Sequence, residues 1–125
     1  MSKRVALIDD DDIFNFLHRE MIIRQYPNAI IEQFSSGIEW IEHLKTHSDV
    51  VYNAIYLDIR MPEMDGFQVL EIMQSIPNHQ FKNSAIYVLS STLDENDLKR
   101  SKANPLVKDF ASKPLSPEQI VELLG

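Results

Sequence analysis

Five short apolar runs, separated by longer segments of helical period, constrain the fold of this chain more than any other feature of its sequence. The runs occupy residues 4–8, 29–34, 54–58, 85–90 and 107–112. Each has the length and composition of a β-strand, and the segments between and after them predict about five helices. Such alternation favours parallel strands joined by right-handed crossovers, with helices on both faces. We therefore expect an α/β fold with a doubly wound parallel sheet.

Side-chain oxygens at the predicted helix starts support this division of the chain. Four pairs match a capping box or its Asp-led variant, in which side chains satisfy free backbone groups: Ser36 with Glu39, Asp65 with Gln68, Thr92 with Glu95, and Ser116 with Gln119. The first helix is expected to begin at Asp11 or Asp12 and to stop before Pro27. Its buried face is expected to hold three apolar residues at heptad-like spacing: Ile13, Leu17 and Met21.

Composition limits the class of protein. With 125 residues and 44% hydrophobic content, the chain is the size of one domain, 1–125, and can form a core without structural metal. It has no cysteine, which excludes disulfides and thiolate metal sites. The apolar stretch before the first acidic run is too short for a signal peptide or membrane span, so we expect a cytoplasmic protein with no membrane partner. The net charge of −7 opposes direct binding to nucleic acid.

Ionisable and hydroxyl side chains stand at the ends of four predicted strands. They are Asp9, Asp10, Asp58, Ser90 and Lys113. Since the carboxyl ends of parallel strands meet at one edge of a sheet, we expect these side chains to converge there. Repulsion between carboxylates is relieved by protonation or by a hard cation such as Mg²⁺, which also accepts phosphate oxygens. The pattern indicates phosphoryl transfer onto a carboxylate, with Asp58 as the best candidate nucleophile because its strand is central.

Four stretches of the sequence resemble, in order and spacing, the motifs of the receiver domains of response regulators in two-component signalling. They are "VALIDDDD" (5–12), "YLDIRMPEMDGFQVL" (56–70), "YVLSS" (87–91) and "DFASKPLS" (109–116). The resemblance extends over essentially the whole chain. It implies a flavodoxin-like fold with a five-stranded parallel sheet of order 2-1-3-4-5.

The resemblance also implies a role for each residue of the cluster. Asp58 would be the phosphoacceptor, taking its phosphoryl group from a histidine kinase, a histidine phosphotransfer protein or a small phosphodonor. Mg²⁺ would be bound by Asp10, Asp58 and the backbone carbonyl of Arg60, with Asp9 completing the acidic pocket. Lys113 would pair with the phosphoryl group. The domain would then catalyse only its own phosphorylation and dephosphorylation, and would not be an enzyme acting on other substrates.

A conformational switch follows from the same resemblance. Ser90 would bond to the phosphoryl group and shift towards it, and Phe110 would rotate inward behind it. The Lys113–Pro114 peptide bond is expected to be cis. A downstream target protein would dock on the face formed by the fourth helix, the fifth strand and the fifth helix. No DNA-binding or catalytic output segment follows the last predicted helix, so if the chain is whole we expect it to act by docking.

Arg60 lies two residues beyond Asp58, where members of this family vary most. We expect its side chain to overhang the phosphoryl group and lengthen the lifetime of the aspartyl phosphate by hindering the attacking water. Slower loss of the phosphoryl group in the wild type than in Arg60→Ala would support this hypothesis.

Three other functions are compatible with parts of the pattern. One is a receiver-like interaction module that is never phosphorylated, although such a module has no reason to keep the full set of polar residues. Another is a metal-dependent phosphohydrolase that forms an aspartyl phosphate, but those enzymes commonly need an acid two residues after the nucleophile, where this chain has Arg60. The third is a flavodoxin-like nucleotide-binding protein, but no glycine-rich loop follows any predicted strand.

Overall fold

A five-stranded parallel sheet forms the centre of the molecule. The computed structural model describes residues 3–76, 81, 83–92 and 94–124. The strands are β1 (Arg4–Ile8), β2 (Ile30–Phe34), β3 (Ala54–Asp58), β4 (Ala85–Ser90) and β5 (Val107–Ser112). Their spatial order is β2-β1-β3-β4-β5, and every neighbouring pair is parallel. The predicted fold class and strand order are therefore confirmed, and only β2 begins one residue later than predicted.

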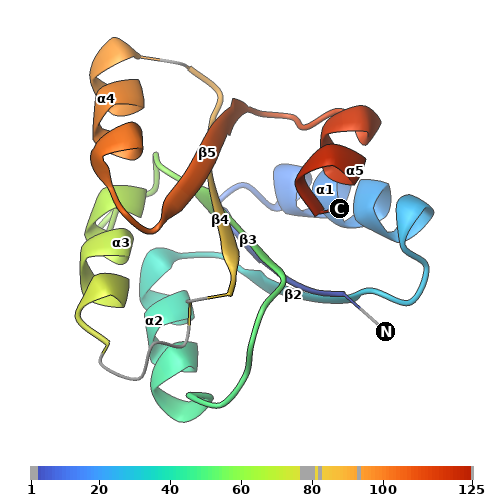
Figure 1. The fold of residues 1–125 in the computed structure, drawn as a ribbon, viewed down its shortest axis with the longest axis horizontal. Helices are drawn as coiled ribbons and strands as arrows, with labels where there is room; N and C mark the ends of the chain where they lie inside the picture. The colour runs from blue at the N-terminus through green and yellow to red at the C-terminus, as the bar shows by residue number, and fades with distance from the viewer. Residues whose placement is uncertain (1–2, 77–80, 82, 93, 125) are drawn as a thin grey trace.

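Helices cover both faces of the sheet. They are α1 (Asp12–Gln25), α2 (Gly37–Thr46), α3 (Gly66–Gln74), α4 (Glu95–Ala103) and α5 (Pro117–Leu124). Figure 1 shows α1 and α5 together on one side of the sheet and α2, α3 and α4 on the other. Within the described ranges, none of these helices has the length and apolar content needed to cross a lipid bilayer.

Hydrophobic side chains fill the space on both sides of the sheet. One buried cluster includes Trp40 and Leu70 and packs between the sheet and α2 and α3. The other includes Ile22, Tyr87 and Ile120 and packs beneath α1 and α5. Because helices cover both its faces, β3 is buried at every position. The end of β3 is therefore held rigidly in the middle of the sheet edge.

The buried face of α1 differs from the prediction. Of the three residues predicted to be buried, Ile13 is 69% exposed, Leu17 is partly buried, and Met21 is partly buried against the core. The fully buried residues of the helix are Asn15, His18 and Ile22. The two polar residues are buried because their side chains satisfy backbone groups from distant segments. The Asn15 amide donates to the carbonyl oxygen of Asp9 at 3.1 Å, and Nε2 of His18 accepts from the amide of Leu115 at 3.1 Å. Burial also lowers the pKa of His18 to about 4, so it accepts this bond as a neutral ring at physiological pH.

Two of the four predicted capping boxes are complete and one is wrong. At α3 and α5 the capping side chain and its partner three residues on exchange both bonds. At α2, Ser36 accepts from the amide of Glu39, but the Glu39 side chain accepts from Ser35 instead. The N-cap of α4 is Asp94 and not Thr92. The backbone of Thr92 is instead bonded to the hydroxyl of Ser90.

Candidate functional site

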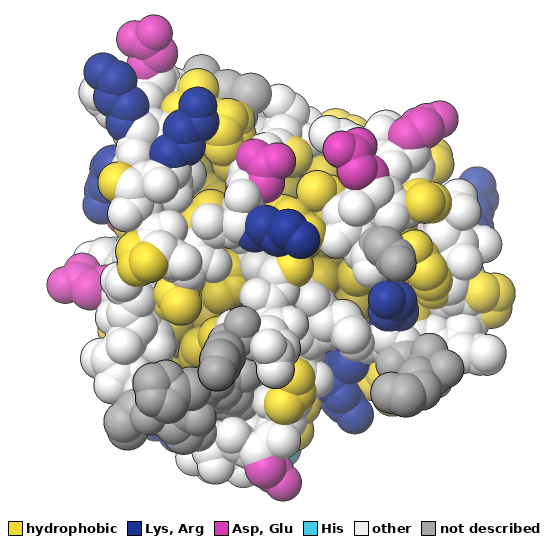
Figure 2. Space-filling view, viewed as in Figure 1, with side chains coloured by type: hydrophobic (Ala, Val, Ile, Leu, Met, Phe, Trp, Pro, Cys, Tyr) yellow, Lys and Arg dark blue, Asp and Glu magenta, His cyan; other side chains and the backbone are white. Residues whose placement is uncertain are grey.

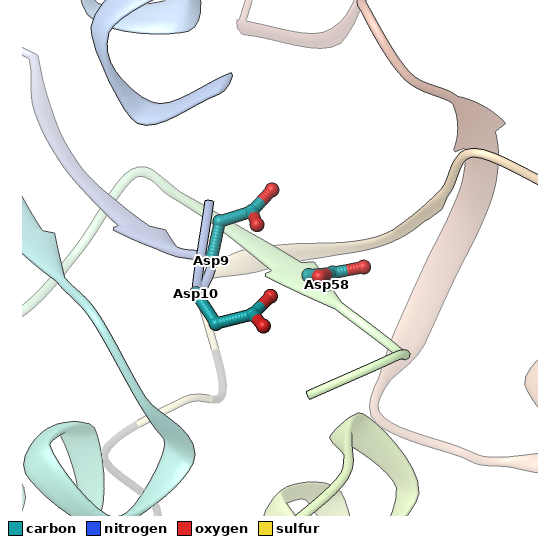
Figure 3. Close-up of side chains that lie close together, drawn as sticks. All are labelled: Asp9, Asp10 and Asp58. Carbon is teal, nitrogen blue, oxygen red and sulfur yellow. The ribbon is translucent and has the colours of Figure 1, made fainter. Parts of the chain in front are cut away.

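The carboxyl ends of β1 and β3 bring three aspartates together. Asp9 and Asp10 follow β1, and Asp58 ends β3, the strand next to it. Figure 3 shows their carboxylates on the same side of the sheet edge. One carboxylate oxygen from each lies within 4.8 Å of the others. Asp9 and Asp58 are buried, whereas Asp10 is exposed, so the cluster opens to solvent on one side.

Lys113 places a positive charge against this cluster from the end of β5. Its Nζ lies 2.9 Å from Oδ2 of Asp9 and 3.3 Å from Oδ2 of Asp58, and its side chain is only 5% exposed. The ring of Phe14 on α1 covers the ammonium at 4.3 Å. The Lys113–Pro114 bond is cis, as predicted. The sequence thus correctly predicted that Lys113 and the aspartates meet, although nothing in it indicated the contact with Phe14.

Burial strongly perturbs the ionisation of Asp58. Desolvation, together with the negative charge of Asp9, raises the pKa of the Asp58 carboxyl from 3.8 to about 7, although Lys113 opposes the shift. For Lys113, burial alone would lower the pKa, but its contacts with Asp9 and Asp58 raise it overall. The approach of Lys113 to Oδ2 of Asp58 lacks hydrogen-bond alignment. That oxygen is therefore buried without a hydrogen bond from any described residue.

An oxygen-binding cation fits this arrangement. Three carboxylates share one small space, one is exposed to solvent, and a buried Asp58 oxygen lacks a hydrogen bond. One lysine cannot balance three carboxylates, and Mg²⁺ prefers carboxylate and carbonyl oxygens together with water. Bound cations favour the ionised form of nearby carboxyl groups, which would offset the raised pKa of Asp58.

Ser90 ends β4 beside the cluster, but its hydroxyl is engaged within its own turn. Its Oγ donates to the carbonyl oxygen of Thr92 at 2.6 Å and accepts from the amide of Thr92 at 3.2 Å. Neither bond involves Asp58. The amide of Lys113 donates to the carbonyl oxygen of Ser90 at 2.9 Å, which ties the end of β5 to that of β4.

Phe110 on β5 lies partly buried behind Ser90. Its ring packs against the core cluster beneath α2 and α3. Phe110 and Ser90 both line a cavity of about 10 Å³, with Asp97 and Ser101 on the α4 side. A volume of this size holds about one water molecule and cannot accept an aromatic ring without movement of its walls.

The loop after β3 is shaped by close backbone contacts. The amide of Gly66 donates to the carbonyl oxygen of Ile59 at 2.9 Å, and a side chain at position 66 would collide with the backbone of Asp58. Glu63 has a φ of 67°, which is uncommon for a residue with a side chain. The glycine in "MPEMDG" therefore allows the start of α3 to approach the end of β3.

The side chain of Arg60 points to α4. Its guanidinium forms an ion pair with the buried Asp97, while its backbone amide donates to Oδ1 of Asp58 at 3.3 Å. Nothing in the sequence indicated this pair, because its members are far apart in the chain and acidic residues in a first helical turn are common. The predicted shielding of Asp58 from water by Arg60 stays a prediction.

Comparisons with known proteins are consistent with this geometry. A family model described as "Response regulator receiver domain" matches residues 5–125. The chain is 28% identical over 126 residues to a chemotaxis protein, CheY, of Thermotoga maritima, and the match covers 100% of this chain and 97% of that protein. It is 29% identical to a hybrid signal transduction histidine kinase of Dictyostelium discoideum, but spans only 7% of that protein's length. A two-component response regulator from Cytophaga hutchinsonii has a crystal structure that matches with a TM-score of 0.89 and 30% identity, covering 98% of this chain and 93% of that one.

Proposed function

The chain belongs to the response regulator receiver family of two-component signalling, and we propose that Asp58 is its phosphoacceptor. The observation that supports this most is the position of Asp58, buried at the end of the central strand between two acidic residues and Lys113. An oxygen of the Asp58 carboxylate attacks the phosphorus of a phosphohistidine. The new O–P bond forms as the P–N bond breaks, and the electron pair leaves with the imidazole nitrogen, which takes up a proton.

Mg²⁺ is the cofactor that the cluster supports best. Asp10, Asp58 and the backbone carbonyl of Arg60 would hold it, and Asp9 would contribute through a bound water. When bound, the ion offsets the negative charge that develops on the transferring oxygens. Lys113 supplies a second positive charge beside Asp58, and its ion pair with Asp9 holds it there.

Ser90 and Phe110 are proposed as the switch. To bond the phosphoryl group, the Ser90 hydroxyl must give up its bonds to Thr92. Because the cavity behind it is small, Phe110 can turn inward only when Ser90 or α4 moves. The switch would therefore alter the face formed by α4, β5 and α5, where we place the docking site for a downstream target protein. Figure 2, seen from the same side as Figure 1, shows acidic, basic and hydrophobic side chains interspersed.

The expected test result is a covalent phosphoryl adduct. Incubation with Mg²⁺ and acetyl phosphate should add the mass of one phosphoryl group to the wild type and none to Asp58→Asn. Asp109→Asn, which removes an exposed carboxylate on β5, should behave as the wild type. The absence of an adduct would favour an unphosphorylated interaction module, and steady release of phosphate from added phosphate esters would favour a phosphohydrolase.

The partner that donates the phosphoryl group is proposed to be a histidine kinase or histidine phosphotransfer protein that docks on α1. The histidine of such a protein must reach Asp58, so the protein has to cover the rim of the site. Helix α1 follows directly after Asp10, and Ile13 and Phe16 are 69% and 59% exposed on it. A cytoplasmic location, without direct binding to nucleic acid or membrane, fits such a partner and the acidic charge of the chain.

Replacing the two exposed apolar residues of α1 should slow phosphotransfer from a protein donor without affecting phosphorylation by a small phosphodonor. Ile13→Ser and Phe16→Ser are each expected to slow phosphotransfer from the protein donor at least about tenfold, since each removes an apolar contact worth about 1.5–3 kcal/mol. Their rates with acetyl phosphate should not change. Val51→Ser, at an exposed apolar position before β3 and away from the site, is the matched control. Equal rates with the protein donor in all variants would exclude α1 as the docking surface.

A further inference from the structure

The ion pair between Arg60 and Asp97 connects the loop after β3 to the first turn of α4. The Asp97 side chain is 9% exposed, whereas that of Arg60 is 56% exposed. A buried carboxylate is costly unless it is paired, and the only hydrogen-bond donor to Asp97 among the described residues is the Arg60 guanidinium. The Arg60 side chain thus connects α4 to the loop that follows Asp58.

Arg60 is also close to the phosphoacceptor. Its backbone amide donates to Oδ1 of Asp58, so the start of its side chain is fixed beside that carboxylate. Asp97, Ser90 and Thr92 line the same small cavity, which places the ion pair on the Ser90 side of Asp58. A new anionic group on Asp58 would therefore form beside the backbone of Arg60, whose guanidinium is already engaged by Asp97.

We propose that Arg60 and Asp97 form a latch on α4, and that a phosphoryl group on Asp58 opens it by competing with Asp97 for the guanidinium. This proposal rests on Asp58 being the phosphoacceptor. A phosphoryl group carries more negative charge than a carboxylate and offers more acceptor oxygens, and a guanidinium binds such groups through two parallel hydrogen bonds. Once Arg60 has left, Asp97 is a buried carboxylate without its partner, and the first turn of α4 must move to hydrate it.

A double-mutant cycle on the lifetime of the phosphoryl group tests the competition. The wild type, Asp97→Asn, Arg60→Ala and the double variant are phosphorylated with acetyl phosphate and Mg²⁺, the donor is removed, and the decay is followed by intact mass. Asp97→Asn should lengthen the lifetime about fivefold, because the guanidinium no longer has to leave a carboxylate. In the Arg60→Ala background the same change should have no effect. Arg60→Ala leaves the Asp97 carboxylate buried without a partner, whereas the double variant has neither charge. Comparing the two shows how much of any change in lifetime comes from the unpaired carboxylate.

Amide hydrogen exchange of residues 95–103 tests the release of α4. Exchange in the wild type should become faster on phosphorylation. In Arg60→Ala, which leaves the Asp97 carboxylate buried without its partner, exchange should already be fast without phosphorylation. Glu95→Gln removes an exposed carboxylate from the same turn and should leave both the lifetime and the exchange unchanged.

Three outcomes would contradict the proposal. The lifetime of the phosphoryl group could be unchanged in Asp97→Asn, or Asp97→Asn could lengthen it equally in the Arg60→Ala background. The third is amide exchange in α4 of the wild type that does not respond to phosphorylation. The absence of an adduct in the wild type would instead refute the phosphoacceptor itself.

Discussion

Replacing Gly66 by alanine is expected to destabilise the protein and to slow its phosphorylation severely. The added Cβ would lie 2.7 Å from the carbonyl oxygen of Asp58 and 2.9 Å from Cα of Ile59. Both atoms belong to the backbone and cannot rotate away, so β3 and α3 must separate. Overpacking of this kind costs about 1–3 kcal/mol or more. Because the strain falls on the residue that carries the carboxylate, we expect the rate with acetyl phosphate to fall at least about tenfold.

The matched control is Gly37→Ala. There an added Cβ would lie 2.5 Å from the Val69 side chain and 3.1 Å from the backbone oxygen of Met64, so its nearest contacts do not include the backbone of Asp58. This variant is expected to lower the melting temperature while keeping the phosphorylation rate of the wild type. Thermal unfolding and the rate of adduct formation are measured on both variants. A Gly66→Ala protein with the stability and rate of the wild type would show that the close approach at Asp58 is not required.

Replacing Asp58 by asparagine is expected to stabilise the metal-free protein by up to about 4 kcal/mol at pH 8. The pKa of Asp58 is raised from 3.8 to about 7, so the folded state holds a proton that the unfolded state releases between these values. Stability contributed by this group therefore falls as pH rises through that window and stays low above it. Asparagine is uncharged at every pH and avoids the loss.

Urea unfolding in the presence of a chelator measures the difference in the free energy of unfolding between the wild type and Asp58→Asn. The gap should be close to zero near pH 4 and largest above pH 7, and adding Mg²⁺ at pH 8 should reduce it because a cation favours the ionised carboxyl group. Asp109→Asn, which removes an exposed carboxylate on β5, is the matched control. Equal free energies of unfolding for the wild type and Asp58→Asn at pH 5 and pH 8 would contradict the raised pKa.

The sheet and the site were predictable because both depend on local patterns. Short apolar runs with flanking turns indicate strands, and parallel strands bring their carboxyl ends to one edge. The positions of Asp9, Asp58 and Lys113 at strand ends were enough to predict that they meet. Their joint placement carried the prediction, since each residue alone is compatible with a cap, a turn or an exposed side chain.

The errors come from contacts between distant segments. The buried face of α1 was predicted only in part. Met21 packs against the core as expected, but Asn15 and His18 are buried because they find backbone partners on other segments, which a hydrophobic pattern cannot indicate. The start of α4 was wrong because Asp94 competes with Thr92 as the N-cap, and the backbone of Thr92 is bonded to Ser90. These interactions depend on how the helices and strands pack against one another, which the local sequence pattern does not determine.

The most direct test of Asp58 as the phosphoacceptor is to locate the phosphoryl group chemically. The protein is phosphorylated with acetyl phosphate and Mg²⁺ and treated with borohydride, which reduces an aspartyl phosphate to homoserine. Tandem mass spectrometry of the peptides then identifies the modified position. We predict homoserine at position 58 and at no other aspartate. Homoserine at Asp9 or Asp10, or a phosphoryl group retained on a histidine, would contradict the assignment.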